Sequence, residues 1–121
     1  MKVILWVSGK LNSQSLILWA KEKKHDIACL ATMDPGSEKL AWATGNLADA
    51  KQASDTNKID LIYKSVKKSG QENFDALDAI LKFSKDKYGA DAVIVTKDPD
   101  VAQPIRNSAK KFNLKTLLLP K

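Results

Sequence analysis

Residues 3–18 read VILWVSGKLNSQSLIL, and this stretch decides the fold. The run Val3–Val7 is apolar at every position, without alternation, which is typical of a strand covered on both faces in a parallel sheet. After a short polar turn the apolar residues take up helical spacing, and Asn12 or Ser13 can accept a hydrogen bond from the first helical turn. The sequence therefore predicts a strand, a tight turn at Gly9 and a helix.

The turn between this strand and this helix is a candidate anion site. First-turn N–H groups have no partner inside a helix, and the helix dipole adds partial positive charge there. We therefore expect the amides around Ser8, Gly9 and Ser13 to hold a phosphate. A simpler interpretation stays open, because a single glycine could serve only to turn the chain.

Apolar and amphipathic runs alternate along the rest of the chain. Strands are predicted over residues 2–7, 27–33, 59–66, 92–96 and 115–119, and helices over 13–24, 47–56, 72–88 and from a capping box at Asp100 to about 113. With right-handed crossovers this pattern gives a five-stranded parallel sheet with helices on both faces, a Rossmann-like α/β fold in a single domain over residues 1–121. Ligands of such folds lie beyond the carboxyl ends of the strands, where the strand order reverses.

Composition favours a cytoplasmic protein. No apolar run approaches the roughly 20 residues that span a membrane, and no signal cleavage site follows the first run. The only cysteine, Cys29, lies in an apolar run, so we expect a buried and inert thiol and no metal site. The net charge of +6 comes from dispersed lysines with a single arginine, which favours a solvated surface over one that binds nucleic acid or anionic ligands, and we expect no membrane partner.

The opening VILWVSGKLNSQSL resembles the first strand and phosphate loop of PP-loop ATP pyrophosphatases, in the adenine nucleotide alpha hydrolase-like superfamily. The best match is the N-terminal domain of diphthine–ammonia ligase-like proteins, and the similarity continues through CLATM, QASDTNKIDL and FDALDAILKFSKDKYGADAVIVT. The family's loop reads Ser-Gly-Gly-Lys-Asp-Ser, which Ser8, Gly9 and Ser13 match. The resemblance implies binding of ATP or AMP, with magnesium accompanying ATP, and adenine near the backbone of Thr32 and Met33.

The loop departs from the family's pattern where the chemistry takes place. Leu11 replaces the lysine that holds the departing pyrophosphate, and that electrostatic contribution is usually the largest in catalysis. Asn12 replaces the aspartate that handles magnesium, and it carries no charge for a cation. Lys10 could supply the missing charge, although a side chain at this position can close the phosphate cradle. The predicted nucleotide-binding residues are Ser8, Gly9, Lys10, Asn12, Ser13, Thr32, Met33, Thr96, Lys97 and Arg106; no catalytic residue is assigned.

We therefore predict a binding protein for an adenine nucleotide, with weak or no catalysis. One alternative is an active ATP-dependent ligase or transferase that adenylates its substrate and releases pyrophosphate, with Lys10 as the cation. Another is an interaction protein that has kept only the fold. A homodimer would cover the edges of so small a sheet. Trp42 either stacks on a ligand ring or anchors its loop to the core, and we favour the anchor.

Overall fold

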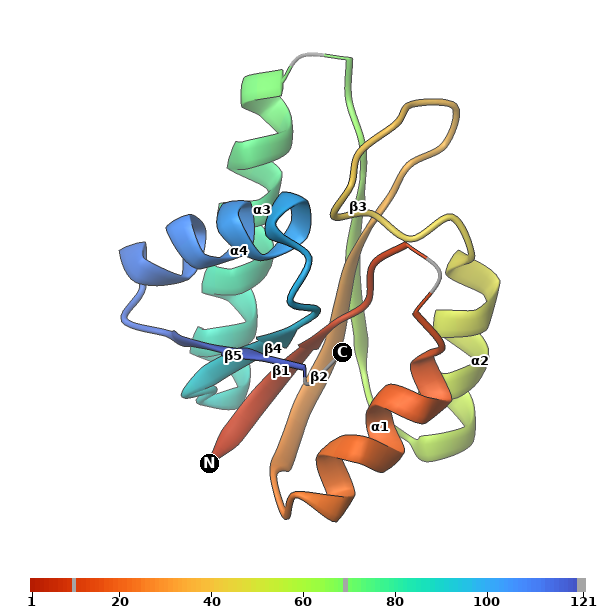
Figure 1. The fold of residues 1–121 in the computed structure, drawn as a ribbon, viewed down its shortest axis with the longest axis vertical. Helices are drawn as coiled ribbons and strands as arrows, with labels where there is room; N and C mark the ends of the chain where they lie inside the picture. Colours follow the sequence, from red (N-terminus) through yellow and green to blue (C-terminus); the bar gives the residue numbers. More distant parts are fainter. Residues whose placement is uncertain (10, 69, 120–121) are drawn as a thin grey trace.

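Strands and helices alternate throughout the computed structural model, which describes residues 1–9, 11–68 and 70–119 (Figure 1). The strands are β1 (Lys2–Trp6), β2 (Asp26–Asp34), β3 (Leu61–Ser65), β4 (Ala92–Val95) and β5 (Lys115–Leu118). The helices are α1 (Ser13–Glu22), α2 (Leu47–Asn57), α3 (Gly70–Tyr88) and α4 (Pro99–Lys111). All four strand pairings are parallel, in the order β3-β2-β1-β4-β5, which confirms the predicted fold class.

Two layers of helices explain why the first strand is apolar without alternation. Val3 and Leu5 pack with Leu16 and other residues of α1 on one face of the sheet. Ile4 and Trp6 pack on the opposite face, with side chains from α3 and α4. Figure 1 shows α1 and α2 together on one side of the sheet and α3 and α4 on the other. Because neighbouring side chains of a strand point to opposite faces, every position of β1 after Lys2 is buried.

Side-chain caps fix where three of the helices begin. Asn12, one of the two cap residues predicted for α1, caps that helix, and Asn46 caps α2. The start predicted for α4 is wrong: its cap is Asp98, whose side chain accepts from the N–H of Asp100, so Pro104 lies inside the helix and not in its first turn. The reason is Pro99, because a residue before proline is held extended and proline is well placed as the first helical residue.

The helical spacing of residues 72–88 predicts a buried stripe for α3, and the structure differs from it at the start; the stripe is Phe74, Leu77, Leu81, Ser84 and Tyr88, with Ile80 alongside. Leu77, Leu81 and Ser84 are buried as expected, but Phe74 is 45% exposed. Asn73 is buried in its place. Its amide accepts from the N–H of Lys67 at 2.7 Å and donates to the carbonyl of the same residue at 2.9 Å, which ties the loop after β3 to the helix. An apolar count misses this position because it is polar yet fully paired.

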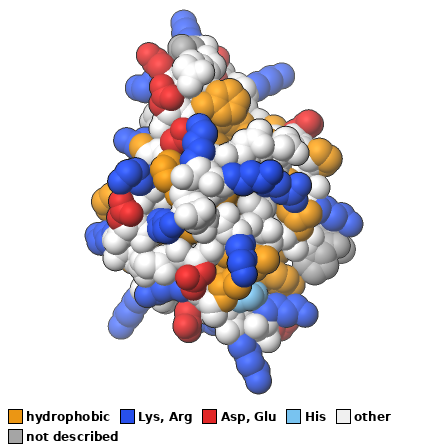
Figure 2. All heavy atoms as spheres, turned by 90° about the vertical axis from the view of Figure 1, so that its left-hand side faces the viewer, with side chains coloured by type: hydrophobic (Ala, Val, Ile, Leu, Met, Phe, Trp, Pro, Cys, Tyr) orange, Lys and Arg blue, Asp and Glu red, His pale blue; other side chains and the backbone are white. Residues whose placement is uncertain are grey.

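Charge is dispersed over the surface, as the sequence suggests. On the face of the molecule that carries α3 and α4, lysine and arginine side chains lie scattered among acidic ones (Figure 2). Within the described ranges, no helix combines the length and the apolar character needed to cross a bilayer. Cys29 is buried as expected, and that burial raises the pKa of its thiol to about 11.

Candidate functional site

A cleft of about 230 Å³ opens at the point where the strand order reverses. The chain runs outward from β1 to β2 and β3 on one side, and to β4 and β5 on the other, so the carboxyl ends of β1 and β4 flank the reversal. The residues lining the cleft come from the loops after β1, β2 and β4 and from α4; they are Ser8, Gly9, Leu11, Ala41, Thr96, Asp98 and Val101. Three of these, Ser8, Gly9 and Thr96, belong to the set predicted from sequence.

Gly9 ties the loop after β1 to the loop after β2. Its φ of +55° is one that residues with a Cβ rarely adopt, so the backbone favours glycine here. Its N–H donates to the carbonyl of Ala43 at 2.8 Å, and its carbonyl accepts from the hydroxyl of Thr44 at 3.3 Å. The amide that we expected to face a phosphate is therefore bonded inside the protein.

The amino-terminal end of α1 already holds a carboxylate. Asp49, in the first turn of α2, accepts from the N–H of Ser13 through Oδ2 at 3.0 Å. The side chain of Asn12 accepts from the N–H of Ser15 at 2.9 Å. The cap on Ser15 was predicted, but the prediction that the Ser13 amide is free for a phosphate is wrong, because a carboxylate from elsewhere in the chain takes the place of an external anion. The hydroxyl of Ser13 is buried and finds no partner among the described residues.

The loop between β2 and α2 closes the position expected for adenine. Thr32 and Met33 are fully buried. The carbonyl of Met33 accepts from the N–H of Thr44 at 3.1 Å, and the Thr32 hydroxyl donates to the carbonyl of Val7 at 2.5 Å. The backbone that would meet a base is therefore covered, because the loop folds back over the end of β2.

Trp42 holds that loop in place. Its side chain is 3% exposed and its ring stacks on Phe74 with centroids 5.7 Å apart. The indole N–H of Trp6 donates to the carbonyl of Trp42 at 2.8 Å. These contacts confirm that Trp42 is an anchor and leave its ring no free face on the core side. The loop after β2 therefore covers the carboxyl ends of β1 and β2, whereas the cleft stays open between the carboxyl ends of β1 and β4.

The remaining predicted residues are spread around α4. Thr96 lines the cleft and Lys97 follows it, exposed to solvent. Arg106 is half-buried further along α4 and is not among the described residues that line the cleft. Lys10 lies outside the described residues. The structure thus brings Thr96 to Ser8 and Gly9, and it leaves Arg106 apart.

Sequence reasoning missed two carboxylates, Asp49 and Asp98. Asp98 caps α4 and lines the cleft. One of its carboxylate oxygens accepts a hydrogen bond from the N–H of Asp100 at 3.0 Å. An Asp directly before Pro99 is a local signal for a helix start, so this one could have been found. The role of Asp49 is set by a contact across 36 residues, and no local pattern carries it.

The polar groups of the cleft define the ligand chemistry it suits. The hydroxyls of Ser8 and Thr96 can donate or accept, and the carboxylate of Asp98 accepts. In the described part of the chain, no group of three or more His, Cys, Asp or Glu side chains is arranged to hold a metal ion. Such a lining suits a neutral ligand part with hydroxyl or amino donors better than it suits a phosphate.

The fold and the switch-point cleft define a Rossmann-like α/β protein with a small cleft, lined by both polar and apolar residues, at the carboxyl ends of its central strands. The chain matches no model of a known protein family, and no curated protein is found to be similar to it.

Proposed function

We propose that the protein binds an adenine nucleotide through its nucleoside part in the switch-point cleft, without turning the nucleotide over. The observation that carries the proposal is the position of the cleft beside Ser8, Gly9 and Thr96, at the carboxyl ends of β1 and β4. Open parallel sheets bind their ligands at this reversal of strand order. The resemblance of the opening residues to PP-loop proteins supports adenine as the base.

The lining of the cleft favours the sugar over the phosphates. Ribose hydroxyls are donors from which a carboxylate can accept, and Asp98 is an exposed carboxylate in the cleft lining. The cleft volume of about 230 Å³ falls below the roughly 300–1,000 Å³ typical of whole ligand pockets, so it suits part of a nucleotide. The phosphates then lie toward solvent, where exposed Lys97 and the net charge of +6 attract them.

Binding without turnover follows from the residues that carry the family's chemistry. Leu11 supplies no cation to a departing pyrophosphate, and Asn12 is used as the cap of α1. Asp49 further occupies the amide of Ser13, which would otherwise stabilise negative charge. An assay of pyrophosphate release from ATP tests this part, and release that is abolished by Lys10→Ala would favour the ligase alternative.

Isothermal titration with adenosine, AMP and ATP, with and without magnesium, tests the binding. We expect the affinities for adenosine and AMP to agree within about tenfold, because the shared part is the part in the cleft. The Ala41→Trp substitution, at an exposed residue of the cleft, should abolish binding. The same substitution at exposed Ala48, outside the cleft lining, is the control.

Three results would contradict the proposal. One is the absence of binding by all three ligands. Another is binding that survives Ala41→Trp, which would place the ligand elsewhere. The third is a preference for ATP over adenosine of more than about a hundredfold, which would mean that the phosphates are held by the protein. Asp98→Asn, which keeps a capping side chain, should lower the affinity for all three ligands by a similar factor.

A further inference from the structure

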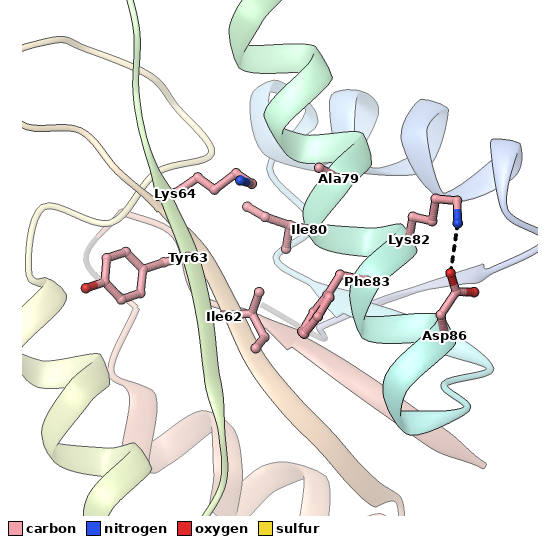
Figure 3. Close-up of a pocket in the computed structure, with 8 residues that line it drawn as sticks. All are labelled: Ile62, Tyr63, Lys64, Ala79, Ile80, Lys82, Phe83 and Asp86. Atoms are coloured by element: carbon pink, nitrogen blue, oxygen red, sulfur yellow. Dashed lines mark hydrogen bonds and ion pairs between the residues drawn. The ribbon is translucent and has the colours of Figure 1, made fainter.

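We propose that two copies of the chain associate through β3, with the two β3 strands antiparallel around a twofold axis at Tyr63. The inference goes beyond nucleotide binding and does not depend on it. It starts from the strand order, which leaves β3 at one edge of the sheet with α2 and α3 on its two sides. Figure 3 shows this strand with Ile62 and Lys64 directed toward α3 and with Tyr63 directed away from that helix.

The backbone of β3 leaves a regular set of groups free for a further strand. The carbonyl of Asp60 accepts from Leu30 at 2.8 Å, and the N–H of Val66 donates to Asp34 at 2.8 Å. Because alternate residues of a parallel strand direct their backbone groups to the same neighbour, the N–H and C=O groups at Leu61, Tyr63 and Ser65 point away from β2. An edge of this kind is a template for pairing with another chain.

Grooves flank this edge. One of about 540 Å³ lies between β3 and α3 and is lined by Ile62, Ile80 and Phe83 among others (Figure 3). It adjoins one of about 510 Å³ toward α2, with which it shares Ile62 and Tyr63. A third, of about 530 Å³, shares Lys64 with the first at the far end of the strand. Tyr63 is 41% exposed and Phe83 47% exposed, so apolar area remains to be covered on both faces of the strand.

The charges of the grooves indicate which partner fits. Their lysines are Lys51, Lys64, Lys67, Lys82 and Lys87. Their acidic residues are Asp55, Asp60, Glu72, Asp75 and Asp86. The two sets cancel, so the net charge of +6 lies entirely outside this surface. A second copy, itself positive, meets the least repulsion here, whereas a strongly acidic partner gains nothing from a balanced surface.

The register follows from the twofold symmetry. A twofold contact brings a surface against itself, so only the residue on the axis meets its own copy. With Tyr63 there, Leu61 lies opposite Ser65 and Ile62 opposite Lys64, and no like charges face each other directly. Asp60 of one copy lies opposite Val66 of the other and diagonally beside its Lys64, on the same face and with opposite sign. Leu61, Tyr63 and Ser65 then exchange about six backbone hydrogen bonds between the copies.

Proline substitutions on the two sheet edges test the pairing. Tyr63→Pro removes an N–H that points outward, so β3 keeps its bonds to β2. On the other edge strand, β5, the N–H of Leu119 donates to Val95, which leaves the N–H of Leu118 outward; Leu118 is 42% exposed, so Leu118→Pro is a matched control. We expect sedimentation equilibrium to show a wild-type dimer, weakened roughly 10- to 100-fold by Tyr63→Pro and unchanged by Leu118→Pro.

A charge pair tests the register itself. Tyr63→Lys and Tyr63→Glu should each be monomeric alone, because each places like charges on the axis, and their equimolar mixture should dimerise. Amide hydrogen exchange at Tyr63 and Ser65 should slow as the wild-type concentration rises. The proposal is overturned if the wild type stays monomeric with these amides unprotected, if both proline variants weaken the dimer equally, or if the mixture stays monomeric. Circular dichroism of each variant checks that the fold is intact.

Discussion

Replacing Asp49 should reveal how much the carboxylate at the start of α1 contributes to stability. Its Oδ2 accepts from the N–H of Ser13, a residue with no exposed surface, while Asp49 itself lies in the first turn of α2. One carboxylate therefore meets two helix amino termini. Each such interaction contributes about 0.3–1 kcal/mol, so Asp49→Asn, which keeps an acceptor oxygen, should lower the free energy of unfolding by about 1 kcal/mol.

Asp49→Ala removes the acceptor as well as the charge. It leaves the Ser13 N–H buried without a partner, which costs about 1–3 kcal/mol beyond the helix-dipole effect. The expected loss is therefore about 2–4 kcal/mol, measured by urea unfolding followed by circular dichroism. Asp55→Asn is the control: Asp55 is exposed near the other end of α2, where a negative charge opposes the dipole, so this change should be neutral or slightly stabilising.

The same variant connects stability to ligand binding. If the Asp49 carboxylate takes the place of an external anion, Asp49→Ala should be stabilised by inorganic phosphate more than the wild type is, because a ligand of the folded state raises its stability. The reasoning would be refuted by an Asp49→Ala protein within about 0.5 kcal/mol of the wild type. It would equally be refuted by a variant as destabilised as expected whose response to phosphate matches that of the wild type.

Three further changes test separate parts of the structure. Asn73→Ala, which breaks both hydrogen bonds to the backbone of Lys67, should cost about 2–3 kcal/mol in urea unfolding, and an unchanged midpoint would contradict the pairing. Because the pKa of Cys29 is raised from 9.0 to about 11, the folded state holds its proton longer than the unfolded state. The stabilisation that comes from the protonated Cys29 thiol is complete below about pH 9 and is lost by about pH 11. Between these pH values the free energy of unfolding of the wild type should fall by about 2–3 kcal/mol more than that of Cys29→Ala. Parallel pH profiles of the two proteins would contradict this. Pro104→Ala restores a helical N–H opposite the carbonyl of Asp100 and should raise the free energy of unfolding by about 1–2 kcal/mol in the same assay, whereas a destabilised variant would mean that the helix needs the proline.

Most of the fold could be predicted because its signals are local. The uninterrupted apolar run of β1 indicates burial on both faces, and the caps Asn12 and Asn46 act on amides three residues away. The wrong start of α4 also has a local cause, since Asp98 before Pro99 is the stronger signal. Phe74 was misplaced because it lies at the edge of the stripe, where stacking on Trp42 decides its exposure.

By itself the sequence determined the alternation of strands and helices, the burial of Cys29 and the loop after β1 as an edge of the switch point. Only the tertiary structure decided that Asp49 occupies the amide of Ser13, that the loop carrying Thr44 closes the β1–β2 side, and that β3 is left at an edge. The physical reason is the reach of the interactions. Periodicity and capping involve residues within a few positions of one another, whereas these features depend on hydrogen bonds between segments that the fold alone brings together.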